Sequence, residues 1–245
     1  MAEVYPRRRR HAYPGLVTCV LLAALLAAAP AWKTAAPGLD TLSVEEGGDR
    51  VTLVRFDLGR FRPEVVFLGP GGVRTAAALR RERAATAAIN GGFFDQDGRS
   101  LGLRVAGGKT MTPLRRGVDW GVLVLRTDGA AIVHSRDFRA DARIEGAIQV
   151  GPRLLARGAP LRLKPQEARR SAVALDRAGR TLTLAVSESG IDANRLAALL
   201  ARLGFDSALL LDGGASTQIS VAAGAFTLDV PGMYGVPDAL VLRPR

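Results

Sequence analysis

Short runs that alternate apolar and polar residues recur along most of the chain and predict a strand-rich protein. Residues 51–57 alternate in this way and are rich in β-branched side chains, and the apolar run at residues 64–68 ends at consecutive Gly and Pro residues. Further strand-like runs cover 87–89, 101–105, 121–126, 131–134, 148–150, 171–176, 181–186, 208–211 and 239–242. Because turn residues separate these runs, we expect largely antiparallel sheets.

Two segments have helical patterns instead. Residues 74–86 are rich in Ala and Arg and contain neither Gly nor Pro, which favours a helix. Residues 191–203 carry leucines at helical spacing, with Asp192 near the start and Gly204 just after the end. With no internal repeat and no second linker, we expect residues 49–245 to form one α+β domain of twisted, largely antiparallel mixed sheets with a few covering helices.

The N-terminal segment has the pattern of an export signal. Four consecutive arginines at positions 7–10 precede an apolar run at residues 15–32, and small residues follow around position 30. We therefore expect residues 1–31 to be either a cleaved signal peptide or a membrane anchor that is kept, since the run approaches the length of a membrane span. Both predict export to the periplasm or beyond. Residues 32–48, which are polar and contain Pro and Gly, are predicted to be a linker.

Composition and charge limit the kinds of partner that the protein is expected to bind. The chain of 245 residues has 48% hydrophobic residues, enough to bury a core, and its single Cys excludes an intrachain disulfide framework. The formal net charge of +11 favours an anionic partner. Nucleic acid is disfavoured because the arginines are scattered, aromatics are only 5%, and the N-terminus indicates export. No nucleotide-binding motif is present, so no cofactor is predicted, and metal dependence and oligomeric state stay open.

Two Gly-rich corners follow predicted strands and are the clearest candidates for chemistry. One begins at Asn90 and continues with Gly91 and Gly92, and the other begins at Asp212 and continues with Gly213 and Gly214. Paired glycines let the backbone take positive φ or approach a ligand closely, and the polar residue before them is held at a strand end. A tight turn is the simpler reading of either corner alone.

At these residues the sequence resembles the phosphodiester glycosidase family. The motifs that carry the resemblance occur in the family's order and are residues 90–94 (NGGFF), 170–176 (RSAVALD), 211–217 (LDGGAST) and 236–240 (VPDAL), which together extend over roughly residues 50–245. Two positions depart from the family pattern, Ala215 in place of a third Gly and Asp238 in place of an Asn. The resemblance implies a hydrolase that cleaves the bond between sugar C1 and the oxygen of a phosphodiester.

The resemblance assigns roles that fit the chemistry of this reaction. The leaving phosphate has a second pKa of about 6 and needs little protonation, so a cation can replace the acid of an ordinary glycosidase. Asp212 is the candidate carboxylate at the anomeric carbon, Arg170 and Arg153 are candidate phosphate clamps, and Asn90 is a candidate for holding a sugar hydroxyl or a phosphate oxygen. The remaining candidate substrate-binding residues are Ser171, Gly91, Gly92, Gly213, Gly214, Ser216 and Thr217.

Two functions are open at this stage. The first is an exported hydrolase acting on a sugar-phosphate in an envelope or extracellular glycan. The second is a non-catalytic envelope protein that binds an anionic polysaccharide during its export or assembly, which the basic charge and Ala215 favour. The residues do not specify the sugar, the anomer or the acceptor that carries the phosphate.

Overall fold

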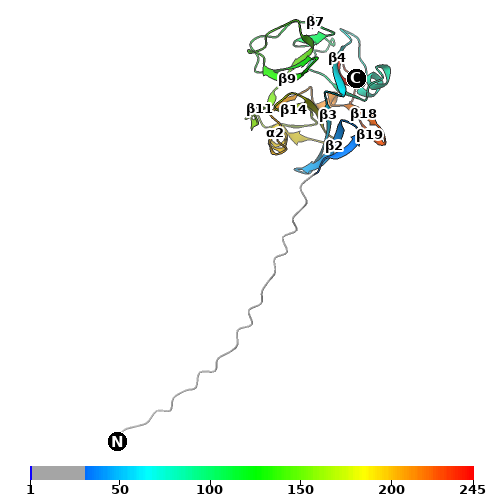
Figure 1. Ribbon diagram of the computed structural model, residues 1–245. Helices are drawn as coiled ribbons and strands as arrows, with labels where there is room; N and C mark the ends of the chain where they lie inside the picture. Colours follow the sequence, from blue (N-terminus) through cyan, green and yellow to red (C-terminus); the bar gives the residue numbers. More distant parts are fainter. Residues whose placement is uncertain (2–30) are drawn as a thin grey trace.

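The computed structural model describes Met1 and residues 31–245, and this part of the chain is dominated by antiparallel strands (Figure 1). It contains twenty strands, two α-helices and one short 3₁₀ helix, and every strand pairing within the sheets is antiparallel. The expected antiparallel sheets are confirmed, but α+β is a poor description of a domain that is mostly β. The difference arises because several segments without a clear local pattern pair as strands.

The largest sheet has eight strands and includes the two strands that were predicted at residues 171–176 and 181–186. In spatial order it consists of β1 (Lys33–Ala36), β2 (Leu39–Glu46), β3 (Asp49–Asp57), β15 (Thr181–Ser187), β14 (Ser171–Leu175), β17 (Ser207–Leu210), β11 (Arg153–Ala156) and β12 (Ala159–Pro160). The turn between β14 and β15 is closed by Asp176, whose Oδ1 accepts from the backbone N–H groups of Arg180 and Thr181 at 2.8 Å. This hairpin places Ser171 at the same end of the sheet as the residue that follows β17.

Two five-stranded sheets complete the domain. One consists of β19 (Phe226–Val230), β18 (Ile219–Ala223), β5 (Ala87–Asn90), β20 (Asp238–Pro244) and β4 (Phe61–Phe67). The other consists of β7 (Lys109–Thr112), β6 (Arg104–Ala106), β10 (Ile144–Val150), β8 (Gly121–Arg126) and β9 (Gly129–His134), and it forms the green lobe of Figure 1. A small pair, β13 (Glu167–Ala168) with β16 (Ile191–Asp192), lies outside these sheets.

The three large sheets share one central hydrophobic core, which explains why the chain forms a single domain. Phe56 and Leu184 enter it from the eight-stranded sheet, Ile89 and Leu240 from the sheet around β5, and Leu123 from the sheet around β8. All five side chains are fully buried. Burying a large apolar side chain contributes about 1.5–3 kcal/mol, so this shared core binds the sheets to one another.

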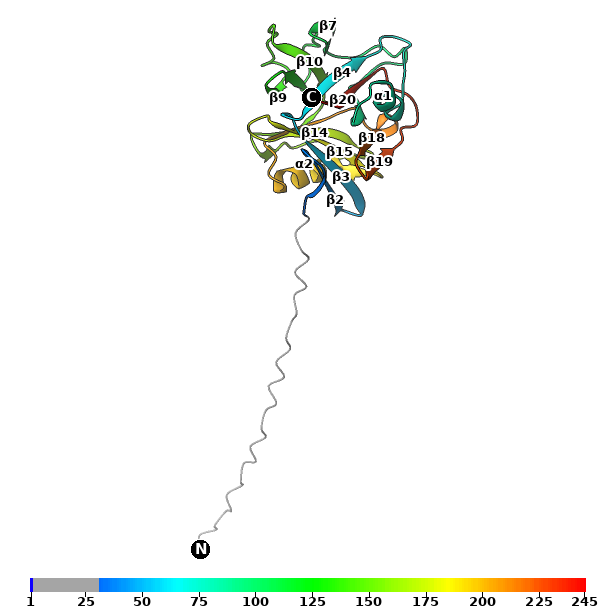
Figure 2. The ribbon, with the colours of Figure 1, turned by 45° about the vertical axis from the view of Figure 1, so that its right-hand side comes forward.

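Each α-helix covers one face of a sheet (Figure 2). Each begins at a residue whose side chain caps it. Helix α1 (Ala76–Glu82) starts at Thr75, whose hydroxyl accepts from the Ala78 N–H, and packs on the sheet around β5. Helix α2 (Ala193–Arg202) starts at Asp192 and packs on the eight-stranded sheet. The first helix is shorter than the predicted 74–86 because Thr75 caps its start and the chain turns through Ala84, with φ +47°, before β5.

The prediction of a linker at residues 32–48 is wrong. Strands β1 and β2 occupy most of it, and β2 pairs with β3 along its whole length. Leu39 and Leu42 are buried in two of the hydrophobic clusters, so the segment is part of the folded domain. Its Pro37 and Gly38 form the turn between β1 and β2 and not a hinge between domains.

The predicted signal peptide or anchor lies outside the described residues except at its two ends. Within the described part of the chain, no helix is both long and apolar enough to cross a membrane.

Candidate active site

The two Gly-rich corners meet although they are far apart in sequence. Asn90 is the last residue of β5, and Asp212 follows β17 in the neighbouring sheet. The Asp212 N–H donates to the Gly91 carbonyl at 3.0 Å, and Asn90 Nδ2 donates to the Asp212 carbonyl at 2.8 Å. These bonds hold the ends of two sheets together and fix the start of the second corner.

Asn90 and Ser171 lie beneath this junction and are both fully buried. Ser171 Oγ donates to Asn90 Oδ1 at 2.7 Å, and the Gln218 N–H donates to the same oxygen at 3.1 Å. The Asn90 amide is therefore occupied by the protein, and the structure gives it no exposed edge for a sugar hydroxyl. The geometry assigns Asn90 and Ser171 to positioning the corners.

The Asp212 carboxyl group is half-buried at the junction. Its Oδ1 accepts from the Gly213 N–H at 3.0 Å. Burial raises the pKa of Asp212 above its ordinary value, and the nearby negative charge of Asp238 adds to this effect. Hydrogen bonds from Ser216 and Gly213 and the positive charge of Arg104 act in the opposite direction. A carboxylate whose ionised form is destabilised by burial is typical of catalytic carboxylates.

A buried ion pair supports the first corner and was not among the predicted site residues. Arg104 and Asp238 are both fully buried, and Arg104 Nε lies 2.9 Å from Asp238 Oδ2. Asp238 also accepts from the Gly92 N–H at 2.9 Å and from Ser100 Oγ at 2.8 Å. The sequence signal for Asp238 was its place in the closing motif, whereas Arg104 in a strand has no local signal.

The first corner needs glycines because the ion pair leaves no room for a Cβ atom, and not because the backbone is left-handed. A Cβ atom on Gly91 would lie 1.8 Å from Asp238 Oδ1, and one on Gly92 would lie 2.3 Å from Arg104 Nη2. Neither residue has positive φ, and in the two corners only Gly214 does, at +61°. The expectation of positive φ is therefore correct only for Gly214.

The backbone donors of the second corner are used within the protein. The Gly213 N–H donates to Asp212, and the Gly214 N–H donates to the Arg169 carbonyl at 2.8 Å. Both glycines were candidate substrate-binding residues, and in this structure the N–H group of each already has a partner within the protein. The 3₁₀ helix η1 (Gly214–Ser216) follows, and Thr217 after it is fully buried with an Oγ1 that has no hydrogen-bond partner among the described residues.

Arg170 is the cation that the structure brings to this corner. Its side chain is half-buried, and Nη1 lies 3.7 Å from the position of a Cβ atom on Gly213. Its Nη2 donates to the Gln166 carbonyl at 2.5 Å, which fixes the guanidinium plane. Burial lowers the pKa of Arg170, but an arginine stays charged at neutral pH. The Nη1 edge has no hydrogen bond to the described residues.

Arg153 lies apart from the other predicted site residues. Its side chain packs against Gly121 and lines a hollow of about 610 Å³ together with His134 and Asp176. Asp212 does not line this hollow. Arg153 therefore lines a hollow to which Asp212 does not contribute.

Two aromatic side chains, Phe94 and Tyr234, lie beside the second corner. The Tyr234 hydroxyl lies 3.4 Å from Ser216 Oγ, and its ring packs edge-on against Phe94 with centroids 6.2 Å apart. Tyr234 is 49% exposed and thus available to a ligand. Phe93 instead packs on the core and against Trp120. Tyr234 was missed because no local pattern marks its loop as adjacent to Ser216.

No group of three or more His, Cys, Asp or Glu side chains within the described residues is arranged to hold a metal ion. Within the described residues the site combines the half-buried Asp212 carboxyl group, the Arg170 guanidinium, the hydroxyls of Ser216 and Tyr234 and the buried Arg104–Asp238 pair.

Comparison with known proteins identifies a family. Residues 83–243 match the sequence model of the phosphodiester glycosidase domain. No curated protein sequence matches the chain.

Three solved structures share the fold. A hypothetical protein from Synechocystis is 18% identical, with a TM-score of 0.62 over 89% of this chain, and this chain spans 65% of it. The catalytic domain of zebrafish N-acetylglucosamine-1-phosphodiester α-N-acetylglucosaminidase, auto-inhibited by its pro-peptide, is 17% identical, with a TM-score of 0.64 over 89% of this chain and 85% of that one. A predicted exported protein from Burkholderia pseudomallei is 15% identical, with a TM-score of 0.56 over 83% of this chain and 74% of that one.

Proposed function

The chain belongs to the phosphodiester glycosidase family, and on that premise we propose that it is an exported hydrolase that cleaves the C1–O bond of a sugar-1-phosphodiester. The observation that carries the proposal is the half-buried Asp212 carboxyl group, with its raised pKa, at the junction of the two corners. The proposed substrate is a sugar linked through phosphate in an envelope or extracellular glycan.

The proposed step needs one ionised carboxylate at the anomeric carbon. Asp212 faces that carbon as the nucleophile or as the base that activates water, and the anomer of the released sugar distinguishes the two. Asp238 is excluded from this role because it is 1% exposed and paired with Arg104. The raised pKa of Asp212 makes it a stronger base than an exposed aspartate once it is ionised.

The leaving group is a phosphate monoester. Its oxygen has a pKa of about 6, so departure needs charge stabilisation more than protonation. The Nη1 edge of Arg170, beside Gly213, supplies a cation that meets phosphate oxygens as the C1–O bond breaks. Tyr234 and Phe94 form the wall against which the sugar ring packs.

The proposed location outside the cytoplasm rests on the arginines followed by an apolar run at the N-terminus. The description of the structurally similar Burkholderia pseudomallei protein as exported agrees with it.

The test is release of free sugar from a panel of synthetic sugar-1-phosphodiesters by the purified protein, with and without a chelator. We expect release by the wild type and a loss of about 10²–10⁴-fold in kcat for Asp212→Asn. NMR of the first product formed assigns its anomer. Wild-type turnover by Asp212→Asn contradicts the role of Asp212. No release from any sugar, together with salt-sensitive binding of anionic polysaccharide that Asp212→Asn retains, contradicts the hydrolase and supports the binding protein.

A further inference from the structure

A second hollow lies in the lobe built around β8 and β10, and it is not part of the Asp212 site. It has a volume of about 780 Å³ and lies between the loops at residues 113–118 and 135–140. Leu103, Leu114, Val118 and Phe138 give it an apolar lining, and Leu103 and Phe138 are buried. Cavities of this size and lining are typical of small-molecule sites.

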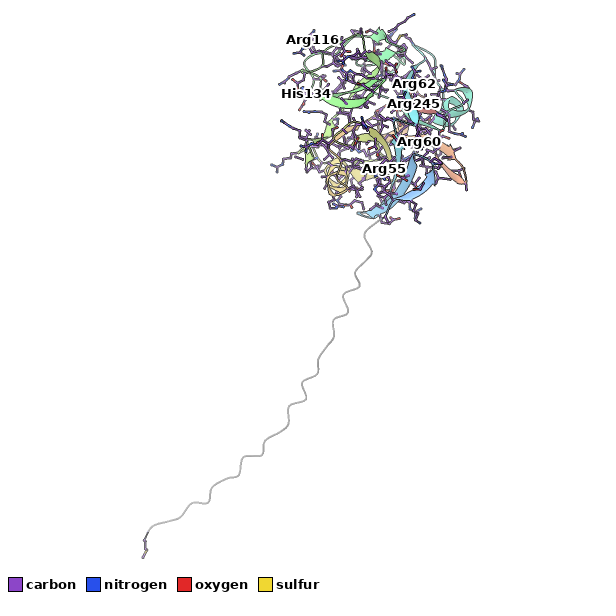
Figure 3. All side chains as sticks on the ribbon, in the orientation of Figure 1. Arg55, Arg60, Arg62, Arg116, His134 and Arg245 are labelled. Carbon is purple, nitrogen blue, oxygen red and sulfur yellow. The ribbon has the colours of Figure 1, made fainter. Side chains whose placement is uncertain are left out.

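Four arginines surround this apolar lining and no acidic residue does. They are Arg115, Arg116, Arg136 and Arg139, two from each loop, and all four are exposed. Figure 3 shows Arg116 at the edge of this lobe, remote from Arg55 and Arg60. The potentials of positive charges around one hollow add together, so the electrostatic potential inside the hollow is positive.

These arginines lack the acidic partners that some other arginines of the described residues have. Within the described residues, ion pairs join Arg55 to Asp40 and Arg126 to Asp141, but none of the four arginines has a carboxylate within 4.0 Å. Of the acids nearby in sequence, Asp137 lines the hollow around Arg153 and not this one, and two others contact other residues. Asp119 lies 2.8 Å from His134 Nε2, and Asp141 binds Arg126 at 2.9 Å. Within the described residues, therefore, no carboxylate lies close enough to form an ion pair with the arginines around the hollow.

The two loops are held in place by one buried side chain. Gln149 is fully buried; its Oε1 accepts from the Arg115 N–H at 2.8 Å, and its Nε2 donates to the Arg115 carbonyl at 2.8 Å and to Ser135 Oγ at 3.0 Å. A single amide thus links the start of one arginine loop to the start of the other. Because the two loops are already held in place, less conformational entropy of the loops is lost when a ligand binds.

Two of the guanidinium groups are also fixed. Arg139 Nη1 donates to the Arg136 and Phe138 carbonyls at 2.8 and 2.9 Å, and the Arg115 guanidinium carbon lies 5.5 Å from the centre of the Trp120 ring. These contacts leave the Nη2 groups without a partner among the described residues. A planar guanidinium with a free edge is suited to bind the oxygens of phosphate in pairs.

From this arrangement we propose that the hollow binds the phosphate monoester of an apolar alcohol. A phosphate monoester carries a charge of about −1.5 to −2 and three acceptor oxygens, so it satisfies more than one arginine, whereas a carboxylate carries one charge. The apolar lining of Leu103, Leu114, Val118 and Phe138 accommodates the attached hydrocarbon. A lipid headgroup and a soluble alkyl phosphate share this chemistry.

The test measures binding of hexyl phosphate, inorganic phosphate and hexanoate to the full chain by calorimetry at fixed ionic strength. We expect hexyl phosphate to bind about tenfold or more tightly than inorganic phosphate, because burial of its methylenes adds to the anion contact. We expect hexanoate to bind more weakly than hexyl phosphate because it carries less charge. Equal binding of hexyl phosphate and inorganic phosphate, or no binding of hexyl phosphate, overturns the proposal.

Matched double variants separate this site from general attraction of anions. Arg116→Gln with Arg136→Gln should weaken hexyl phosphate binding about 10- to 100-fold. Arg81→Gln with Arg162→Gln removes the same charge from exposed arginines whose side chains make no hydrogen bond or ion pair with the described residues, and it should leave binding unchanged. An equal loss in both double variants overturns the proposal.

Two further arms complete the design. The first measures binding to phosphatidylcholine vesicles with and without phosphatidic acid. Binding that requires phosphatidic acid and is lost in the Arg116 and Arg136 variant assigns a lipid headgroup. Binding of hexyl phosphate without binding to these vesicles assigns a soluble ester. Asp212→Asn should keep hexyl phosphate binding, so failure of the proposed hydrolase and failure of this site give different results.

Discussion

The Asn90 side-chain amide donates to the backbone carbonyl of Asp212 at 2.8 Å, and this bond joins two Gly-rich corners that are 122 residues apart in the chain. It sets the position of the proposed catalytic carboxylate by holding the backbone on which that carboxylate stands. Asn90 in turn is held by Ser171 and Gln218. The Asp212 side chain is therefore presented by a rigid support, which favours a defined geometry for chemistry.

The activity should depend on pH through Asp212. Because burial raises the pKa of Asp212 and the proposed step needs its ionised form, kcat/KM should fall as pH decreases, and the fall should begin at a higher pH than for an exposed aspartate. The pH profile of sugar release by the wild type measures this. An acid limb at or below the ordinary aspartate pKa would contradict the assignment.

Asp212→Asn should raise the stability of the protein at neutral pH. The pKa of Asp212 is higher in the folded than in the unfolded chain, so its ionisation costs folding free energy above the folded pKa, and that cost disappears below the unfolded pKa. Thermal unfolding should give the variant a higher Tm than the wild type at pH 7, with the difference shrinking toward pH 3. A difference that grows on acidification would show that burial does not dominate at Asp212.

Arg170→Lys should reduce kcat/KM by about 10- to 100-fold, because a lysine ammonium cannot contact two phosphate oxygens in the plane of a guanidinium. Arg162→Lys is the control, since Arg162 is exposed in the loop between β12 and β13. Steady-state kinetics on the best sugar-1-phosphodiester measure both. Equal rates for Arg170→Lys and the wild type would remove Arg170 from the phosphate contact.

Gly91→Ala should destabilise the fold by about 1–3 kcal/mol or more, because the added Cβ overlaps the Asp238 carboxylate and displaces it from Arg104. Gly190→Ala is the matched control, since it lacks positive φ and its nearest neighbour to a Cβ atom lies 3.8 Å away. The control should change the free energy of unfolding by less than about 0.5 kcal/mol. Denaturant unfolding of both variants tests the claim that close approach explains this Gly.

Removing β1 and β2 should destabilise the domain. A chain of residues 48–245 loses the buried side chains of Leu39 and Leu42, each of which contributes about 1.5–3 kcal/mol, and exposes the edge of β3. A chain of residues 31–245 keeps them and serves as the control. A comparison of their Tm values measures the effect, and equal values would return residues 32–48 to the role of a linker.

Local patterns determined much of the fold. The strand predictions at 121–126, 171–176 and 181–186 correspond to β8, β14 and β15, and the leucine spacing predicted α2. Such patterns can be read from sequence because alternation and helical spacing depend on neighbouring residues alone. The four ordered motifs at residues 90–94, 170–176, 211–217 and 236–240 were together sufficient to predict the family. The patterns did not reveal β1 and β2, because Pro37 and Gly38 also fit a linker and only pairing with β3 distinguishes the two.

Tertiary structure alone decided which polar groups of the site are free. The Asn90 amide and the Gly213 and Gly214 N–H groups are used inside the protein. Arg170 Nη1, in contrast, makes no hydrogen bond with the described residues, and the Asp212 carboxyl group is only half-buried. The Arg104–Asp238 pair joins residues that no local spacing relates. A sequence specifies the chemical groups available at each position, but whether a donor or a charge is already satisfied depends on contacts between distant strands.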